Sequence, residues 1–112
     1  MSTIFGKIIE GTLPAKKVFE NERILVIEDI YPQAPVHLLI MPKKPIRNLQ
    51  SMQQADLPLI AEMMGVIQQL ALDLGIEEGY RVVTNNGAHG GQEIFHLHFH
   101  LLGGKPLSGK LG

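Results

Sequence analysis

The sequence predicts an α+β domain in which five antiparallel strands form one sheet and one long helix packs on a face of it. Two observations predict this fold. Short β-rich apolar runs recur between turns rich in proline and glycine, and residues 57–74 are strongly apolar with helical periodicity. A chain of 112 residues with 45% hydrophobic and 19% charged residues is sufficient for a single domain, residues 1–112.

A short N-terminal helix is expected over residues 3–10, because its apolar residues at positions 4, 5, 8 and 9 repeat at helical spacing and Gly11 follows. The five strands are expected at 17–20, 23–30, 36–41, 80–84 and 94–102. Prolines separate several of them, since proline cannot donate a hydrogen bond to a sheet. We expect these strands to form a meander, with residues 23–30 half buried.

The long helix is expected over residues 57–74, with Gly75 as its stop. Apolar residues cover most of its circumference, whereas Glu62, Gln69 and Asp73 fall on one narrow stripe. A surface helix of a monomer needs only one apolar stripe. We therefore expect a homodimer interface along this helix, the alternative being a helix with a few exposed apolar side chains.

Composition excludes several classes of function. A net charge of −1 argues against a nucleic-acid clamp, which would carry a basic excess. The absence of cysteine excludes disulfides, thiolate zinc sites and cysteine nucleophiles. The first residues do not read as a signal peptide, and no apolar stretch is expected to span a membrane. We expect a soluble cytoplasmic domain with neither a nucleic-acid nor a membrane partner.

Three of the five histidines alternate with apolar residues near the C-terminus: His96, His98 and His100. With the period of two of a strand, the three rings share one face and line a surface or cleft, while the apolar residues face the core. One chemistry for such rings is a metal site. His96 and His100 would lie ~13 Å apart on an extended strand, so further ligands, His37 or His89, would be needed.

The other chemistry is nucleophilic catalysis. A neutral imidazole is a good nucleophile near pH 7, and a neighbouring ring can act as a general acid. The preceding loop contains Gly87, Gly90 and Gly91, whose N–H groups can approach an anion closely, although such glycines also occur in plain hairpin turns. This reading predicts an anionic, phosphate-like target.

The run from His96 to Leu102 matches the H-φ-H-φ-H-φ-φ pattern, where φ is apolar, of the histidine triad (HIT) superfamily. Further segments resemble its Hint branch, the nucleoside phosphoramidases: residues 4–9, 29–37, 90–93 and 102–104. The pair Gln92-Glu93 and the tail at 104–107 resemble the bacterial members. The resemblance therefore covers nearly the whole chain.

The resemblance implies a role for each matching residue. His98 would attack the α-phosphorus, His100 would contact the phosphate and the leaving group, and His96 and His37 would orient the site. The remaining implied positions are Asn85, Gly91, Gln92 and Glu93 at the phosphate and the leaving-group side, Asp29 at the ribose hydroxyls, and Ile4, Phe5, Ile8, Ile30 and Leu39 around the base. No metal and no cofactor is implied.

Some of these positions have simpler explanations. Ile8 and Leu39 could be core residues, and Asp29 could belong to the turn before Tyr31. Many eukaryotic relatives have serine where this chain has Glu93, and a carboxylate cannot donate to phosphate unless it is protonated. A side-chain contact from Glu93 to phosphate is therefore not expected, although its backbone N–H could serve.

The expected function is that of a homodimeric purine nucleoside phosphoramidase, with an AMP- or GMP-type substrate and a nucleotidyl-histidine intermediate. The dimer would join two sheets into a larger continuous one. Two alternatives remain: a dinucleoside polyphosphate hydrolase, and a nucleotide-binding scaffold or regulatory protein. The sequence does not separate adenosine from guanosine or name the amine.

Overall fold

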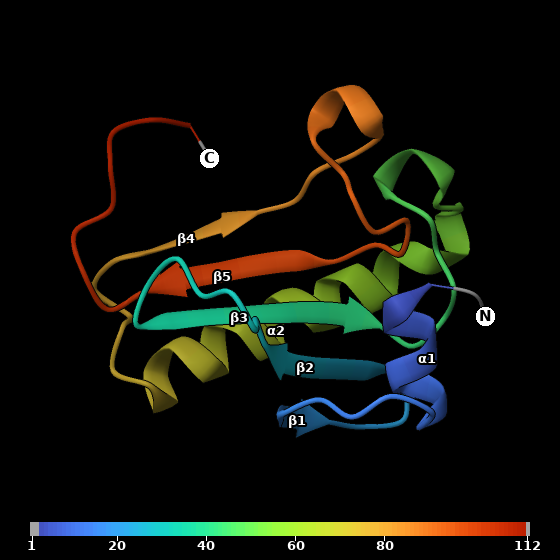
Figure 1. The fold of residues 1–112 in the computed structure, drawn as a ribbon, viewed down its shortest axis with the longest axis horizontal. Helices are drawn as coiled ribbons and strands as arrows, with labels where there is room; N and C mark the ends of the chain where they lie inside the picture. Colours follow the sequence, from blue (N-terminus) through green and yellow to red (C-terminus); the bar gives the residue numbers. More distant parts are fainter. Residues whose placement is uncertain (1–2, 112) are drawn as a thin grey trace.

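The computed structural model describes residues 3–111 and has the predicted α+β architecture (Figure 1). The helices are α1 (Ile4–Glu10) and α2 (Leu57–Asp73). The strands are β1 (Lys17–Glu20), β2 (Ile24–Glu28), β3 (Val36–Pro42), β4 (Tyr80–Val83) and β5 (Phe99–Gly103). Single 3-10 turns occupy Leu49–Ser51, Gln54–Asp56 and Ala88–Gly90. The predicted class, with five antiparallel strands, one long helix and one short N-terminal helix, is confirmed.

The sheet is not a simple meander. Its order is β1-β2-β3-β5-β4, with every neighbouring pair antiparallel. After β3 the chain runs through α2 across one face of the sheet and forms the outer strand β4, and β5 then returns between β3 and β4 (Figure 1). The predicted meander is wrong for the last two strands, because α2 carries the chain past the position that β5 fills.

The two faces of the sheet are covered by different helices. On one face, Ile24 and Val26 pack with Met63 and Ile67 of α2 in the larger core cluster. On the other, Leu25 and Ile27 join Leu39 and Met41 beneath Phe5 and Ile8 of α1. The prediction that residues 23–30 are half buried is therefore wrong, since every β2 residue but the last is buried. A strand with both faces covered is apolar throughout.

The helix α2 serves as the core helix of the domain. Its buried residues, including Met63 and Ile67, face the sheet, and Glu62 is held at one flank by an ion pair with Arg23 of 2.7 Å. The helical segment Gln54–Asp73 has 20 residues, and its most apolar stretch of 18 residues has a mean hydropathy of 1.2, so by length and composition alone it could cross a membrane, contrary to the expectation from sequence. Packing of one face on the sheet accounts for only part of that composition, since Met63, Ile67, Leu70 and Ala71 are the buried residues of α2.

Candidate active site

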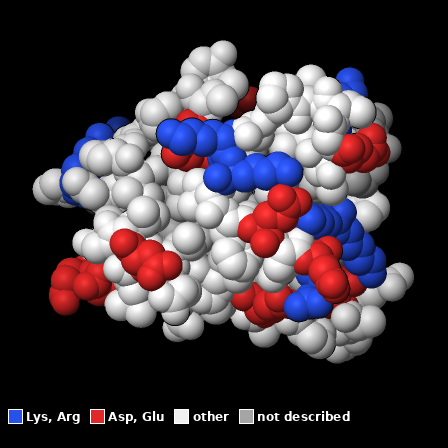
Figure 2. All heavy atoms as spheres, turned by 90° about the horizontal axis from the view of Figure 1, so that it is seen from below, with Lys and Arg blue, Asp and Glu red and all other residues white. Residues whose placement is uncertain are grey.

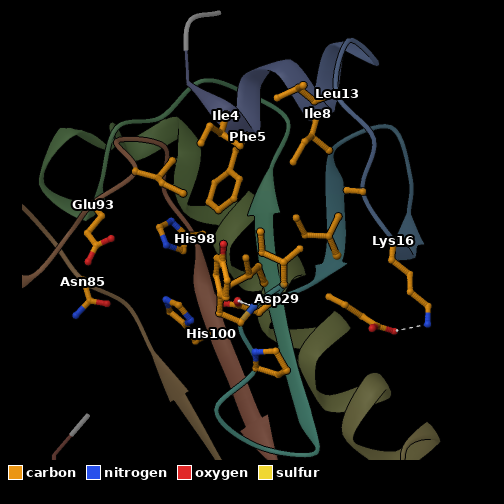
Figure 3. Close-up of a pocket in the computed structure, with 18 of the residues that line it drawn as sticks. Ile4, Phe5, Ile8, Leu13, Lys16, Asp29, Asn85, Glu93, His98 and His100 are labelled. Carbon is orange, nitrogen blue, oxygen red and sulfur yellow. Dashed lines mark hydrogen bonds and ion pairs between the residues drawn. The ribbon is translucent and has the colours of Figure 1, made fainter.

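A cavity of about 910 Å³ opens between α1, the sheet and the loop before β5 (Figure 3). Twelve of the predicted site residues line it: Ile4, Phe5, Ile8, Asp29, Ile30, Leu39, Asn85, Gly91, Gln92, Glu93, His98 and His100. The other two, His37 and His96, are buried behind the wall. The structure thus brings together residues from both ends of the sequence.

The sheet sets the spacing within this cavity. His100, Leu39 and Ile27 are successive cross-strand partners on β5, β3 and β2. Two strand spacings amount to about 10 Å, so the row runs from the histidines to an apolar end beneath α1. There Phe5 stands edge-on to the His98 ring, with centroids 4.9 Å apart.

The alternation predicted that the three imidazoles share one face, and the structure agrees. Leu97, Phe99 and Leu101 pack in the α2 cluster. On the α1 side, His98 and His100 line the cavity, and His96 stands edge-on to Phe5 with ring centroids 6.3 Å apart.

The strand β5 begins only at Phe99, and residues 94–98 form an irregular approach to it, so the predicted strand of 94–102 starts too early. The Leu97 N–H donates to the carbonyl of Ile46, 2.7 Å away, which diverts the backbone from the ladder. His96 is buried beside the cavity, and its Nε2 lies 2.7 Å from the carbonyl oxygen of Pro42.

The His98 ring presents a lone pair to the cavity. Its Nδ1 lies 2.7 Å from the carbonyl oxygen of His96, which can only accept, so Nδ1 carries the proton. Nε2 is then unprotonated. The Thr84 hydroxyl donates to the His98 carbonyl at 2.9 Å and fixes the backbone. Burial lowers the pKa of His98, so the ring is neutral near pH 7.

The His100 ring presents the complementary group, an N–H. The backbone N–H of Gln33 donates to Nδ1 of His37 at 3.0 Å, so the proton of neutral His37 is on Nε2. That Nε2–H donates to Nδ1 of His100 at 2.9 Å, and the His100 proton must then be on its own Nε2. A hydrogen-bond chain from the β2–β3 loop thereby sets the His100 tautomer.

The histidine pKa values favour the neutral forms that this chain requires. Burial is the largest of the effects that lower the pKa of His100 to about 4; the neighbouring His98 and His37 rings contribute to the shift, and Asp29 opposes it. Burial likewise lowers the pKa of His37 and of His96. Four neutral rings near pH 7 therefore lie at or behind the cavity wall.

Acidification is expected to destabilise the fold through these rings. Because their folded pKa values lie below the ordinary value of 6.5, the unfolded chain binds more protons between the two values. The stability they contribute is complete above pH 6.5 and is lost as the pH falls towards about 4. Urea unfolding at pH 7.5 and at pH 5.0 should give a lower midpoint at pH 5.0, and His100→Gln should weaken that dependence. A midpoint that rises on acidification would contradict the assignment.

The alternative metal site fits the donor pattern poorly. The Nε2 of His37, Nδ1 of His100 and a carboxylate oxygen of Asp29 lie within 4.8 Å of one another. A histidine that binds a metal through Nε2 normally donates its Nδ1–H to an acceptor. Here Nδ1 of His37 faces the N–H donor of Gln33, so the required proton would meet another proton. The triangle is better explained as a hydrogen-bonded chain.

Asp29 fits both of its sequence interpretations. Its Oδ1 accepts the Tyr31 N–H at 2.8 Å, as a turn residue would, and Oδ2 lies 3.3 Å from Nε2 of His37. The half-buried carboxylate also lines the cavity between the histidines and the apolar end (Figure 3). Ile8 and Leu39 are likewise both core residues and cavity wall.

Gln92 differs from the expectation of a direct phosphate contact. Its side chain is 5% exposed and is bonded to four protein groups, so it has no donor left for a ligand.

Nine further residues of the cavity wall were not predicted from the sequence: Leu13, Pro14, Ala15, Lys16, Ile27, Glu28, Tyr31, Pro32 and Ile94. The segment 13–16 has no helical or strand periodicity that could have marked it as part of the wall. Tyr31, in contrast, lies close in sequence to the predicted site residue Asp29, and that position could have indicated that it lines the cavity.

Comparisons with known proteins agree with this geometry. Residues 10–107 match the family model of the HIT domain. A HIT-like protein of Chlamydia muridarum is 61% identical over 96% of this chain and 85% of its own length. The crystal structure of a HIT family hydrolase from Legionella pneumophila superposes with a TM-score of 0.94 at 44% identity, covering 97% of this chain and 98% of that one. The structure of a HIT family hydrolase from Clostridium thermocellum superposes with a TM-score of 0.93 at 42% identity, covering 98% of this chain and 96% of that one. The cavity histidines thus belong to a known fold, and the chain is a member of the HIT domain family.

Proposed function

We propose that this protein hydrolyses purine nucleoside 5′-phosphoramidates to a nucleoside monophosphate and an amine. The observation that carries the proposal is the pair of complementary nitrogens on one cavity wall. His98 offers a lone pair on Nε2, and His100 offers a proton on Nε2. Their ring centroids are 5.2 Å apart, so both can reach one phosphorus centre and its leaving group. Two structural relatives are named HIT family hydrolases, which supports hydrolysis as the reaction class.

The reaction divides into two displacements at phosphorus. In the first, the anionic substrate binds together with one proton, which the His37–His100 pair takes up. Nε2 of His98 then forms a bond to the α-phosphorus, the P–N bond to the amine breaks, and the amine leaves with the Nε2 proton of His100, so that the pair returns to neutrality. In the second, water attacks the phosphorus, the bond to His98 breaks, and His100 takes up a proton from the water. The sum is substrate plus water giving monophosphate plus amine.

The cavity has a size and polarity that suit a nucleotide. The row from His100 to Ile27 spans about 10 Å, which suits the reach from a 5′-phosphorus to the base. Its far end is walled by Ile4, Phe5 and Ile8 of α1, which can sandwich a flat apolar ring. Asn85 and Glu93 lie on the other side of the histidines, where the amine would depart (Figure 3).

Turnover of adenosine 5′-phosphoramidate by the purified protein tests the proposal. We expect release of AMP and ammonia, with slower turnover of diadenosine polyphosphates. A reversed preference would favour the dinucleoside polyphosphate hydrolase. Tight binding of AMP without turnover of either substrate would favour the nucleotide-binding scaffold.

Asp29 is proposed to select ribose. A carboxylate can accept from the 2′ and 3′ hydroxyls together, and each such hydrogen bond is worth about 1.5–3 kcal/mol. We expect kcat/KM to fall by a factor of tens for a 2′,3′-dideoxy substrate. Asp29→Asn keeps an acceptor for the Tyr31 N–H and should reduce activity on the ribose substrate only. Additive effects in the double cycle would instead mean that Asp29 is purely a turn residue.

We also propose that two copies pair through β4 and α2. The other edge strand, β1, is protected by charge: Lys17 and Lys43 both pair with Glu20, and Figure 2, seen from that side, shows acidic and basic residues interleaved. In contrast, β4 carries the apolar residues Tyr80 and Val82, whose exposed fractions are 37% and 39%. Pairing of two β4 edges would extend the sheet across the dimer.

The flank of α2 that points towards β4 can be identified. Val82 is opposite Leu101, whose side chain packs in the α2 cluster, so Val82 lies on the same face of the sheet as α2. Glu62 is held by Arg23 on the β2 side, and Met64 lies about 200° further round the helix. Partly buried Met64 therefore lies on the β4 side, where a second α2 would cover it.

Met64→Glu is expected to convert the dimer into a folded monomer, because a charge would be buried in an apolar interface. Sedimentation at micromolar concentration measures this, with Gln69→Lys on the opposite flank as the control that should remain dimeric. A monomeric wild-type protein would refute the dimer.

A further inference from the structure

The side chain of Gln92 is the most completely bonded polar group near the cavity. Its Oε1 accepts from the Gly87 N–H at 2.9 Å and from the Asn48 amide at 3.4 Å. Its Nε2 donates to the carbonyls of Arg47 at 2.8 Å and Ile94 at 3.1 Å. Because a backbone N–H can only donate and a carbonyl can only accept, this pattern fixes the orientation of the amide.

These bonds close the loop that forms the phosphate end of the cavity. Besides the Oε1 contact, the backbone N–H of Gln92 donates to the Gly87 carbonyl at 3.0 Å, so two bonds join residues 87 and 92. Gly87 and Gly91 have φ angles of +75° and +85°, which side chains other than glycine rarely adopt. The closed loop is then tied to residues 47 and 48, after β3.

Glu93, the next residue, can offer a ligand a hydrogen-bond donor, which the Gln92 side chain cannot. Among residues 3–111, the backbone N–H of Glu93 has no acceptor, and Glu93 lines the cavity. An N–H group that is held in place can bind an anion without the cost of reorganising at binding.

We propose that Gln92 is a positioning residue, which never touches the substrate but holds the 87–93 loop so that the Glu93 N–H faces the phosphate. The inference rests on the proposed function, because it needs a phosphate at this end of the cavity. Loss of the Gln92 amide would leave the partly buried backbone groups of Arg47, Gly87 and Ile94 without this partner and let the loop move, while the apolar end beneath α1 is unchanged.

The test compares the affinities of AMP and adenosine, two ligands that differ only in the phosphate. Gln92→Met keeps the length of the side chain and removes all four hydrogen bonds. Calorimetric titration should show AMP binding weakened about tenfold or more, as expected for loss of a hydrogen bond to a charged group. Adenosine affinity should stay within about twofold. Gln92→Asn, an uncharged amide too short to make the same bonds, is the second variant, should Gln92→Met fail to fold.

Met63→Ala is the control for general destabilisation, since Met63 lies in the core cluster of α2, away from the loop. It should leave the ratio of AMP to adenosine affinity unchanged at temperatures where it is folded. If folded Gln92 variants lose affinity for AMP and adenosine equally, or lose affinity for neither, the positioning role would be overturned. Wild-type protein that binds AMP no better than adenosine would contradict the proposed function itself, and the inference with it.

Discussion

Replacing His98 with alanine is expected to lower kcat/KM for adenosine 5′-phosphoramidate by about 10⁴-fold or more. The reason is that no other nitrogen can replace its lone pair. His100 carries a proton on the nitrogen in question, and His96 is turned towards the Pro42 carbonyl. The measurement is steady-state turnover with AMP detection, alongside thermal unfolding to show that the variant folds.

AMP binding by His98→Ala separates chemistry from binding. The cavity walls and the Asp29 carboxylate are unchanged, so the dissociation constant for AMP should change far less than the rate. His89→Ala is the matched control, because His89 lies in the exposed 3-10 turn and does not line the cavity. Substantial turnover by His98→Ala would show that another group attacks the phosphorus.

Replacing His100 with glutamine is expected to produce the second largest effect, a loss of about 10²–10³-fold for an amine leaving group. Glutamine can still donate a hydrogen bond but cannot transfer a proton. The amine needs that proton to depart, whereas 4-nitrophenolate does not. Comparison of adenosine 5′-phosphoramidate with adenosine 5′-(4-nitrophenyl phosphate) should therefore show a much smaller loss for the second substrate.

Equal losses on both substrates would mean that His100 stabilises the phosphate charge and does not act as the acid. The wild-type ratio of the two rates provides the reference for this comparison. His37→Phe should reproduce part of the effect, because His37 Nε2–H sets the His100 tautomer.

Local patterns were sufficient where local contacts decide the structure. The helix α1 begins after Thr3, whose hydroxyl accepts the Gly6 N–H, and ends at Gly11 with a φ of +86°, both of which the sequence indicates. The strand β1 has the predicted bounds of residues 17–20. In each case the residues that determine the element lie within it or next to it.

Contacts between distant segments explain the features that could not be predicted from the sequence. β5 starts late because Leu97 bonds to Ile46, about fifty residues earlier in the chain. The His100 tautomer depends on the backbone N–H of Gln33, a group that every non-proline residue has and no sequence pattern marks. The residue types of the site could therefore be predicted, but not the protonation pattern that makes His98 the nucleophile.

The most direct test of the account is to trap the covalent intermediate. Wild-type protein mixed with adenosine 5′-phosphoramidate should be quenched within one turnover at neutral or alkaline pH, digested, and analysed by mass spectrometry. The account predicts that the peptide containing residue 98 gains one adenylyl group, that fragmentation places it on His98, and that His98→Ala gains none. An adenylyl group on His96 or His100, or burst-free turnover without any adduct, would contradict it.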